Sequence, residues 1–216
     1  MRRVKHTSIN RAARVGIPVF PGAFAIGISF GVLARTEHFS SVAALVMSAT
    51  TFAGSSQIAA VTLLGGGGTV AAAIVAALLL NSRYAPIGIS VARAFQGRLP
   101  KRFVEAQLVV DESWALGNGD RSLILGIGAI LWVLWVGGTA IGLALGSVIG
   151  DPSRYGIDGA FAALFVALLA TQVGTRTRRK VAFLGAAIAA VLTPFTPAGV
   201  PIVVATAAVL VGWRRP

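Results

Sequence analysis

Arg83 lies alone in a long uncharged stretch of the chain. No charged residue occurs in 39–82, and nine more uncharged residues follow Arg83 before the next charge. A charge at membrane depth is costly unless it meets a partner or water, so it is by default a functional candidate. Pro86 frees the carbonyl four residues earlier, which predicts a helix kink at 81–86 beside the guanidinium. Arg83 and Asn81, two residues before it, are therefore candidates for binding a substrate.

Three roles for Arg83 are compatible with the sequence. Its planar guanidinium matches a carboxylate through two parallel hydrogen bonds, which favours contact with a substrate. Alternatively, its long side chain extends to the polar headgroups on the cytoplasmic face. In the third role it forms a structural ion pair with Asp111 or Glu112. The sequence leaves these alternatives open.

A second candidate site is the polar break "FAGSSQ" at 52–57 in the same apolar tract. Glycine and serine weaken a helix interior, and serine favours the position that begins a helix. A half-helix starting near Gln57 would direct unpaired N–H groups and a positive dipole end at an anionic group. Ser55, Ser56 and Gln57 would add neutral donors and acceptors. The simpler alternative is that these residues only cap a helix.

The third candidate is the acidic pair Asp111 and Glu112, followed closely by Trp114. Adjacent residues lie on different faces of a helix, so the two carboxylates are not a catalytic dyad. One of them is a candidate for binding an ammonium group or carrying a proton, because burial raises the pKa of a carboxyl. Alternatively, they lie on an interfacial helix and face solvent or the nearby Arg98 and Arg102.

The composition indicates a helical protein that crosses the lipid bilayer several times. Hydrophobic residues make up 56% of the 216 residues and charged residues 12%, about half the share in soluble domains. The mean hydropathy is +0.81. Apolar runs are continuous and do not alternate, which favours helices over a barrel. The fold class is therefore an all-α polytopic membrane protein.

The net charge of +12 is gathered in short basic clusters between apolar runs, as expected for cytoplasmic loops. These clusters lie at 2–14, 93–102, 176–180 and 214–215, and they place both termini in the cytoplasm. No basic face interleaved with aromatic residues supports nucleic-acid binding. The absence of cysteine excludes disulfides and thiolate chemistry. No metal-ligand spacing, nucleotide loop or base beside a nucleophile is present, so we expect no metal, no cofactor and no enzyme activity.

About seven membrane-embedded segments are expected in a single domain, 1–216. They are 15–34, a re-entrant hairpin formed by 41–53 and 57–64, then 69–90, 123–150, 159–175, 181–192 and 200–213. The segment 103–116 is too short to span and is either interfacial or tucked into the bundle. The re-entrant hairpin follows from charge: two full crossings there would put the cluster 93–102 outside, against the positive-inside rule. A flat helical hairpin remains the alternative.

Four motifs resemble those of the AzlC family, the large subunit of branched-chain amino acid exporters. They are "FGVLA" at 30–34, "FAGSSQIAA" at 52–60, "NSRYAPIGIS" at 81–90 and "VDESWAL" at 110–116, in matching order and spacing. The family usually has a histidine where this chain has Tyr84. The resemblance implies an inner-membrane permease that exports valine, leucine, isoleucine or similar apolar amino acids. It also implies a small hydrophobic partner subunit of the AzlD type.

The candidate residues fit a zwitterionic substrate with an apolar side chain. Arg83 or the half-helix would take the carboxylate, and Asp111 or Glu112 the ammonium group. Phe52, Ile58 and Trp114 would supply an apolar wall. Because no nucleotide site exists, we expect coupling to the proton gradient. The competing hypothesis is a non-transporting membrane assembly or receptor subunit with a structural charge pair; the oligomeric state and the amino acid carried are open.

Overall fold

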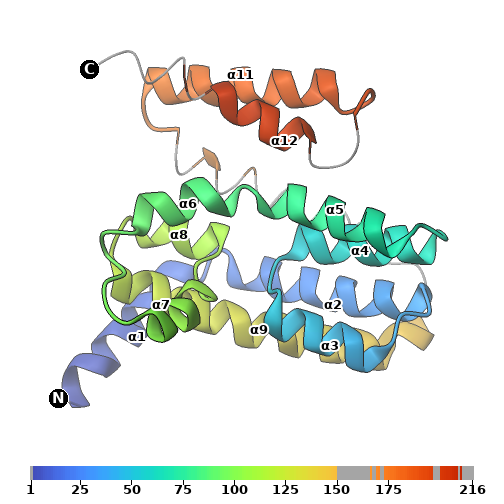
Figure 1. Cartoon of the computed structure of the whole chain (residues 1–216). Coiled ribbons are helices and arrows are strands. Elements are labelled where there is room, and N and C mark those ends of the chain that lie inside the picture. Colours follow the sequence, from blue (N-terminus) through green and yellow to red (C-terminus); the bar gives the residue numbers. More distant parts are fainter. Residues whose placement is uncertain are drawn as a thin grey trace.

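The computed structural model describes residues 2–149, 166, 169–170, 173–196, 200–208 and 210. Every regular element among these residues is helical, as the composition predicts (Figure 1). Two described helices, Val70–Val91 and Arg121–Gly146, are long and apolar enough to cross a membrane, and a bent pair near the N-terminus makes a possible third. The count of about seven embedded segments stays a prediction.

The N-terminal part forms two helices where the sequence predicted one span at 15–34. Helix α1, Arg2–Gly16, and helix α2, Phe20–Thr36, meet at a bend of 76°. Pro18 lies in the break and Pro21 in the first turn of α2. Both would lie inside a continuous helix, where a proline cannot donate the backbone hydrogen bond. Starting a new helix at Phe20 puts Pro21 in the first turn, where no such bond is made.

The predicted break in the apolar tract separates helix α3, Ser41–Thr50, from helix α4, Gly54–Gly65. Phe52, at the break, has a positive φ of 43°, which turns the chain sharply. Figure 1 shows the two helices running back from this turn toward the same end of the molecule. A Cβ added at Gly65 would meet the side chain of Glu37, just after α2, so α4 ends close to where α2 ends. Helix α4 starts three residues before the predicted Gln57.

Helix α5, Val70–Asn81, and helix α6, Tyr84–Val91, together form the candidate span Val70–Val91, which matches the predicted segment 69–90 within a residue at each end. The interruption falls at Ser82 and Arg83, within the predicted kink region. Its cause is the one inferred from Pro86, which cannot donate the backbone hydrogen bond of a regular helix. The interruption places Arg83 at the junction of the two helices.

The predicted short segment 103–116 is divided between two helices. Helix α7, Leu99–Ala106, has no buried residue, whereas helix α8, Asp111–Gly117, packs against helix α9, Arg121–Ile149. Asp120 begins α9 by accepting hydrogen bonds from the backbone N–H groups of Ser122 and Leu123 at 2.9 and 3.3 Å. The tucked alternative therefore applies to α8.

The core of the bundle is the contact between α2 and α9, which is the most extensive between any two described elements. Glycines allow the backbones to approach closely: a Cβ at Gly27 would lie 2.8 Å from the carbonyl oxygen of Trp135, and one at Gly138 would lie 2.7 Å from that of Phe24. Such small-residue contacts are typical of helix packing in membranes. They fix the rotation of α9, and with it the direction of Trp135.

The C-terminal part forms helix α11, Arg176–Leu192, and helix α12, Val200–Ala205, followed by a 3₁₀ turn at Thr206–Ala208. Helices α11 and α12 pack on each other, and α12 also contacts α5 (Figure 1). The basic cluster 176–180 is inside α11, where the sequence predicted a helix starting only at Val181. The predicted loop 151–158 and most of the predicted segment 159–175 lie outside the described residues.

Candidate functional site

An ion pair joins the junction of α5 and α6 to the start of α8. The Arg83 Nη2 atom lies 3.0 Å from the Asp111 Oδ2 atom, and the two side chains are only 15% and 16% exposed. The guanidinium also lies over the ring of Tyr84, 5.3 Å from its centroid. Of the acids that the sequence offered as partners for Arg83, the structure selects Asp111.

Asp111 is positioned by the capping of α8. The Ser113 hydroxyl accepts a hydrogen bond from the Val110 backbone N–H at 2.9 Å and is fully buried. A carboxylate in the first turn is also favoured by the positive end of the helix dipole. Burial raises the pKa of Asp111, and the charge of Arg83 opposes that rise. The cap thus holds the carboxylate toward Arg83.

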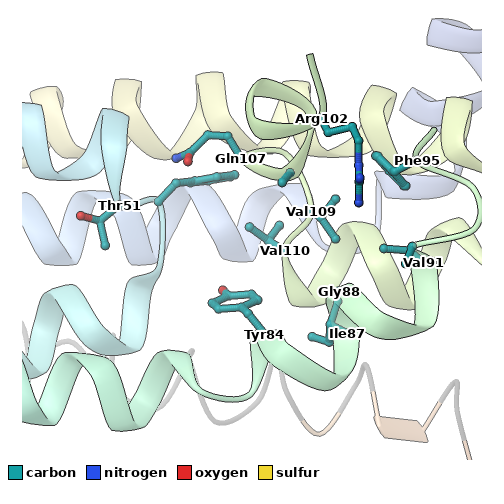
Figure 2. Close-up of a pocket in the computed structure, with 13 residues that line it drawn as sticks. Thr51, Tyr84, Ile87, Gly88, Val91, Phe95, Arg102, Gln107, Val109 and Val110 are labelled. Atoms are coloured by element: carbon teal, nitrogen blue, oxygen red, sulfur yellow. The ribbon is translucent and has the colours of Figure 1, made fainter. Parts of the chain in front are cut away.

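A wide cavity of about 380 Å³ lies beside this ion pair, between α6 and the α7–α8 connection (Figure 2). Its walls are mostly apolar, and its polar lining residues are Thr51, Tyr84, Arg102 and Gln107. The Gln107 side-chain amide donates to the Thr50 carbonyl at 2.5 Å, which ties the chain after α7 to the end of α3.

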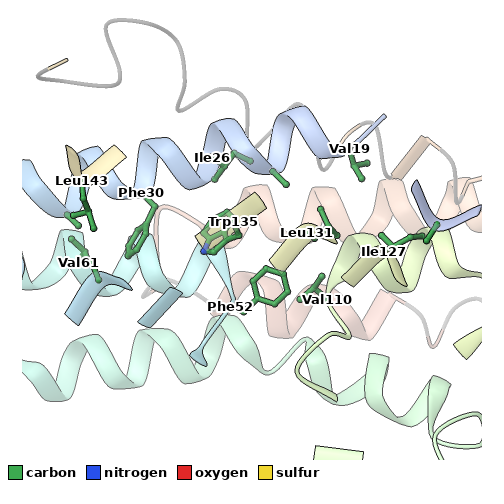
Figure 3. Packing of buried hydrophobic residues seen from close by; sticks show 14 of the residues in the cluster. Val19, Ile26, Phe30, Phe52, Val61, Val110, Ile127, Leu131, Trp135 and Leu143 are labelled. Atoms are coloured by element: carbon green, nitrogen blue, oxygen red, sulfur yellow. The ribbon is translucent and has the colours of Figure 1, made fainter. Parts of the chain in front are cut away.

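A second cavity, of about 30 Å³, contains the charges. It has room for about two water molecules. Its lining includes Arg83, Asp111 and Glu112 together with the apolar walls Ala23, Ile26, Phe52, Leu131 and Trp135. Figure 3 shows Phe52 close to Leu131, Trp135 and Val110 in the buried cluster between α2 and α9. We call this cavity the charged chamber.

Glu112, the second carboxylate of the charged chamber, forms no salt bridge within the part of the chain that the structure describes. Helix α8, which carries it, lies outside the candidate membrane spans. Burial raises the pKa of Glu112 to about 7, and the nearby charge of Asp111 adds to the rise. Its carboxyl can therefore gain and lose a proton near neutral pH.

Three buried polar atoms near this region lack a hydrogen-bond partner among the described residues: Ser55 Oγ, Asn81 Oδ1 and Trp135 Nε1. Trp135 also lines the charged chamber. Buried polar groups are nearly always hydrogen-bonded, so an unsatisfied one indicates a place for water or a ligand. The indole N–H of Trp135 was not among the residues predicted from the sequence, and no sequence signal distinguishes it from Trp132 on the same helix.

Gln57 belongs to a buried polar network between α3, α4 and α9. Its side chain accepts from the Ala53 backbone N–H at 3.1 Å and donates to Ser48 Oγ at 3.1 Å. Ser48 Oγ is 2.9 Å from Thr139 Oγ1, whose hydroxyl donates to the Trp135 carbonyl. The Gln57, Ser48 and Thr139 side chains are fully buried. This network fixes the turn that carries Phe52.

We expect Gln57→Leu to lower the free energy of unfolding by about 1–3 kcal/mol, because it leaves the Ala53 N–H buried without an acceptor. Thermal unfolding of the purified protein in detergent measures this. Thr50→Val is the control, since the exposed Thr50 hydroxyl only donates to the Val46 carbonyl of its own helix. Equal unfolding temperatures for the two variants would contradict a structural role for the network.

The structure brings together three of the predicted site residues and separates the others. Arg83, Asp111 and Glu112 share the charged chamber. Trp114 instead donates to Ser90 Oγ at 2.8 Å and packs against a second cluster around Phe95. The remaining predicted site residues, Asn81, Ser55, Ser56 and Gln57, do not line either of these cavities.

The chain matches one protein family and several known proteins. The family model described as "AzlC protein" matches residues 18–149. "Branched-chain amino acid transport protein AzlC" of Bacillus subtilis (strain 168) is 28% identical over 164 residues, which is 72% of this chain and 64% of that protein. This chain therefore spans a little less than two thirds of the length of that relative.

Two further relatives carry the description "Uncharacterized membrane protein". The one from Archaeoglobus fulgidus is 31% identical over 202 residues, covering 91% of this chain and 90% of the relative. The one from Helicobacter pylori (strain J99) is 27% identical over 183 residues, covering 81% and 80%. No solved structure matches the chain. The extent of the family match and the Archaeoglobus relative together establish that this chain is a membrane protein that belongs to the AzlC family.

Proposed function

We propose that this chain transports branched-chain or similar apolar amino acids, and that the charged chamber is where the zwitterion binds. The observation that carries the proposal is the Arg83–Asp111 pair, held among apolar walls beside Glu112 at the interruption of a candidate span. The name of the Bacillus relative, a branched-chain amino acid transport protein, supports this substrate class. The guanidinium would bind the carboxylate, and an acid of the pair Asp111–Glu112 the ammonium group.

The chamber as described is too small for an amino acid, so binding requires its walls to separate. A cavity of about 30 Å³ holds water only. The carboxylate of the substrate would then replace Asp111 as the partner of Arg83, and its ammonium group would replace Arg83 as the partner of Asp111. Because an ion pair within the protein satisfies both groups when the site is empty, the closed chamber avoids an uncompensated buried charge.

We propose the membrane arrangement from the charge pattern and the fold together. The protein lies in the inner membrane as one domain, with about seven embedded segments and both termini cytoplasmic. Helices α3 and α4 form a re-entrant hairpin, which is supported by the sharp turn at Phe52 and by the closeness of Gly65 to Glu37. The transport direction is export, and a small hydrophobic subunit of the AzlD type completes the permease.

We also propose that Glu112 couples transport to the proton gradient. A carboxyl with a pKa of about 7 is mostly protonated below pH 7 and mostly ionised above it, so it exchanges its proton in the working range. Because Arg83, Asp111 and Glu112 share the chamber, a bound substrate would change the charges around Glu112. The protonation of Glu112 would therefore depend on whether substrate is bound.

Glu112→Gln should abolish leucine movement driven by a pH gradient, because the amide cannot release a proton. Exchange of labelled for unlabelled leucine without a gradient should persist, because Asp111 remains in the chamber to bind the ammonium group. Both are measured in proteoliposomes that contain the chain and its small subunit. Glu37→Gln is the control, because Glu37 follows α2 and lies outside the chamber. This variant should keep both activities. Gradient-driven transport by Glu112→Gln would exclude this glutamate as the proton carrier.

The function itself is tested with the same proteoliposomes, in which a pH gradient should drive labelled leucine or valine across the membrane. A lack of transport over a panel of amino acids, with both subunits present, would refute the proposal. The second candidate, a non-transporting assembly or receptor subunit, is favoured by the direct 3.0 Å ion pair that the closed chamber contains. In that case, each single substitution, Arg83→Asp or Asp111→Arg, would impair folding and function. The double variant Arg83→Asp/Asp111→Arg would restore both.

A further inference from the structure

The wide cavity has the size and lining of a ligand-binding site. Its volume of about 380 Å³ lies in the range of small-molecule pockets. The wall is formed largely by apolar side chains, among them Ile87, Val91, Phe95 and Val109. By contrast, the charged chamber of about 30 Å³ admits no substrate as it stands. A ligand that reaches the chamber would therefore find room first in the wide cavity.

Arg102 is the charged residue among those that line the wide cavity. Figure 2 shows its side chain reaching from α7 toward Phe95 and Val91. No carboxylate among the described residues forms a salt bridge with it, unlike Arg121, which pairs with Glu105 nearby. A cation beside an apolar wall suits a carboxylate with an aliphatic side chain. The cation would bind the carboxylate, and the wall would contact the aliphatic part.

One wall separates the wide cavity from the charged chamber. Phe52, Tyr84 and Val110 line both. Tyr84 directly follows Arg83 in the sequence, and Val110 directly precedes Asp111. A movement of this wall would therefore also move the backbone of both residues of the ion pair. Phe52 has a positive φ of 43°, a backbone conformation that is unfavourable for an aromatic residue and that the buried Gln57 network maintains.

We propose that the wide cavity is a second binding site for apolar amino acids, in which Arg102 binds the carboxylate and the apolar wall takes the side chain. This inference rests on the proposed function and adds a step to it. The amino acid occupies the wide cavity before the wall of Phe52, Tyr84 and Val110 moves and admits it to the charged chamber. Arg102 is thus a substrate-binding residue that acts before Arg83.

The absence of native cysteine allows a direct test of occupancy. Ala92→Cys introduces a thiol in the lining of the wide cavity, and Val104→Cys one on the exposed face of α7 outside it. Each variant, purified with its small subunit in neutral-lipid nanodiscs, is labelled with a methanethiosulfonate reagent at increasing L-leucine. L-Leucine should slow labelling at Ala92→Cys but not at Val104→Cys. Leucinamide, which lacks the carboxylate, should protect at least about tenfold more weakly, as expected for one charge-assisted hydrogen bond.

Adding Arg102→Gln to Ala92→Cys should raise the leucine concentration needed for protection by about tenfold, and Arg102→Lys should restore part of it. Arg98→Gln is the matched control, because Arg98 precedes α7 and does not line the cavity. Protection that is absent, or unchanged by Arg102→Gln, would overturn the second site. An arginine that only contacts lipid phosphates would give this result.

Transport separates this proposal from the proposed function. In proteoliposomes, Arg102→Gln should raise KM for leucine while keeping kcat, because the chamber is intact. Protection of Ala92→Cys by leucine in a protein that transports nothing would retain the binding site and refute the transport function. Transport without any protection would retain the function and overturn the site.

Discussion

Arg83→Ala should abolish amino acid transport. The substitution removes the guanidinium that would bind the substrate carboxylate, and it leaves Asp111 without its 3.0 Å partner in a site where the side chains are about 15% exposed. Truncating one member of a buried ion pair typically costs about 3–5 kcal/mol, so the variant also loses stability. Leucine transport in proteoliposomes, normalised to the amount of folded protein by size-exclusion chromatography, measures the first effect.

Two companion variants separate binding from folding. Arg83→Lys keeps the charge but loses the planar fork, so transport should be weakened rather than lost. Arg83→Gln/Asp111→Asn removes both charges together and avoids an unpaired buried charge, so this protein should fold and still not transport. Normal transport by the doubly neutral protein would show that the pair is structural and that the chamber does not bind the zwitterion.

Gly142→Ala should strongly destabilise the bundle. Gly142 lies where α9 packs against α2, and this contact leaves no space for a side chain at that position. An added Cβ would collide with the carbonyl oxygen of Ile28 on α2 and come within 2.9 Å of the Gly31 Cα. Backbone atoms cannot move aside as a flexible side chain can, so the helices must separate. Overpacking of this kind costs about 1–3 kcal/mol or more.

Gly137→Ala is the matched control, since it makes the same change five residues earlier on α9 and its Cβ would meet nothing within 4 Å. Thermal unfolding in detergent should show a clear drop for Gly142→Ala and no drop for Gly137→Ala. Transport should fall in parallel with folded protein, because α9 also carries Trp135 and Leu131 of the charged chamber. A drop of the same size in both variants would indicate a general loss of glycine flexibility and contradict the packing argument.

The sequence by itself determined the class of protein and two of the places where its helices break, but not the bend between α1 and α2. Long apolar runs and few charges require helices in lipid, because every backbone N–H and C=O must then be paired within the segment. Prolines and glycine–serine stretches disrupt helices locally, so the breaks near 52–57 and 81–86 were predictable from nearby residues alone. The isolated charge of Arg83 and the acids of α8 stood out for the same reason: they are rare in such a composition.

Only the tertiary structure decided which of these residues meet. Arg83 pairs with Asp111 because α8 is tucked against α9 and its cap directs the carboxylate to the α5–α6 junction. Gln57, on a similar polar break, turns instead to Ser48. Side-chain direction depends on how each helix is rotated about its axis, and close glycine contacts between α2 and α9 set that rotation. Such contacts join residues more than a hundred positions apart, as Gly27 and Trp135 show, and no local pattern encodes them.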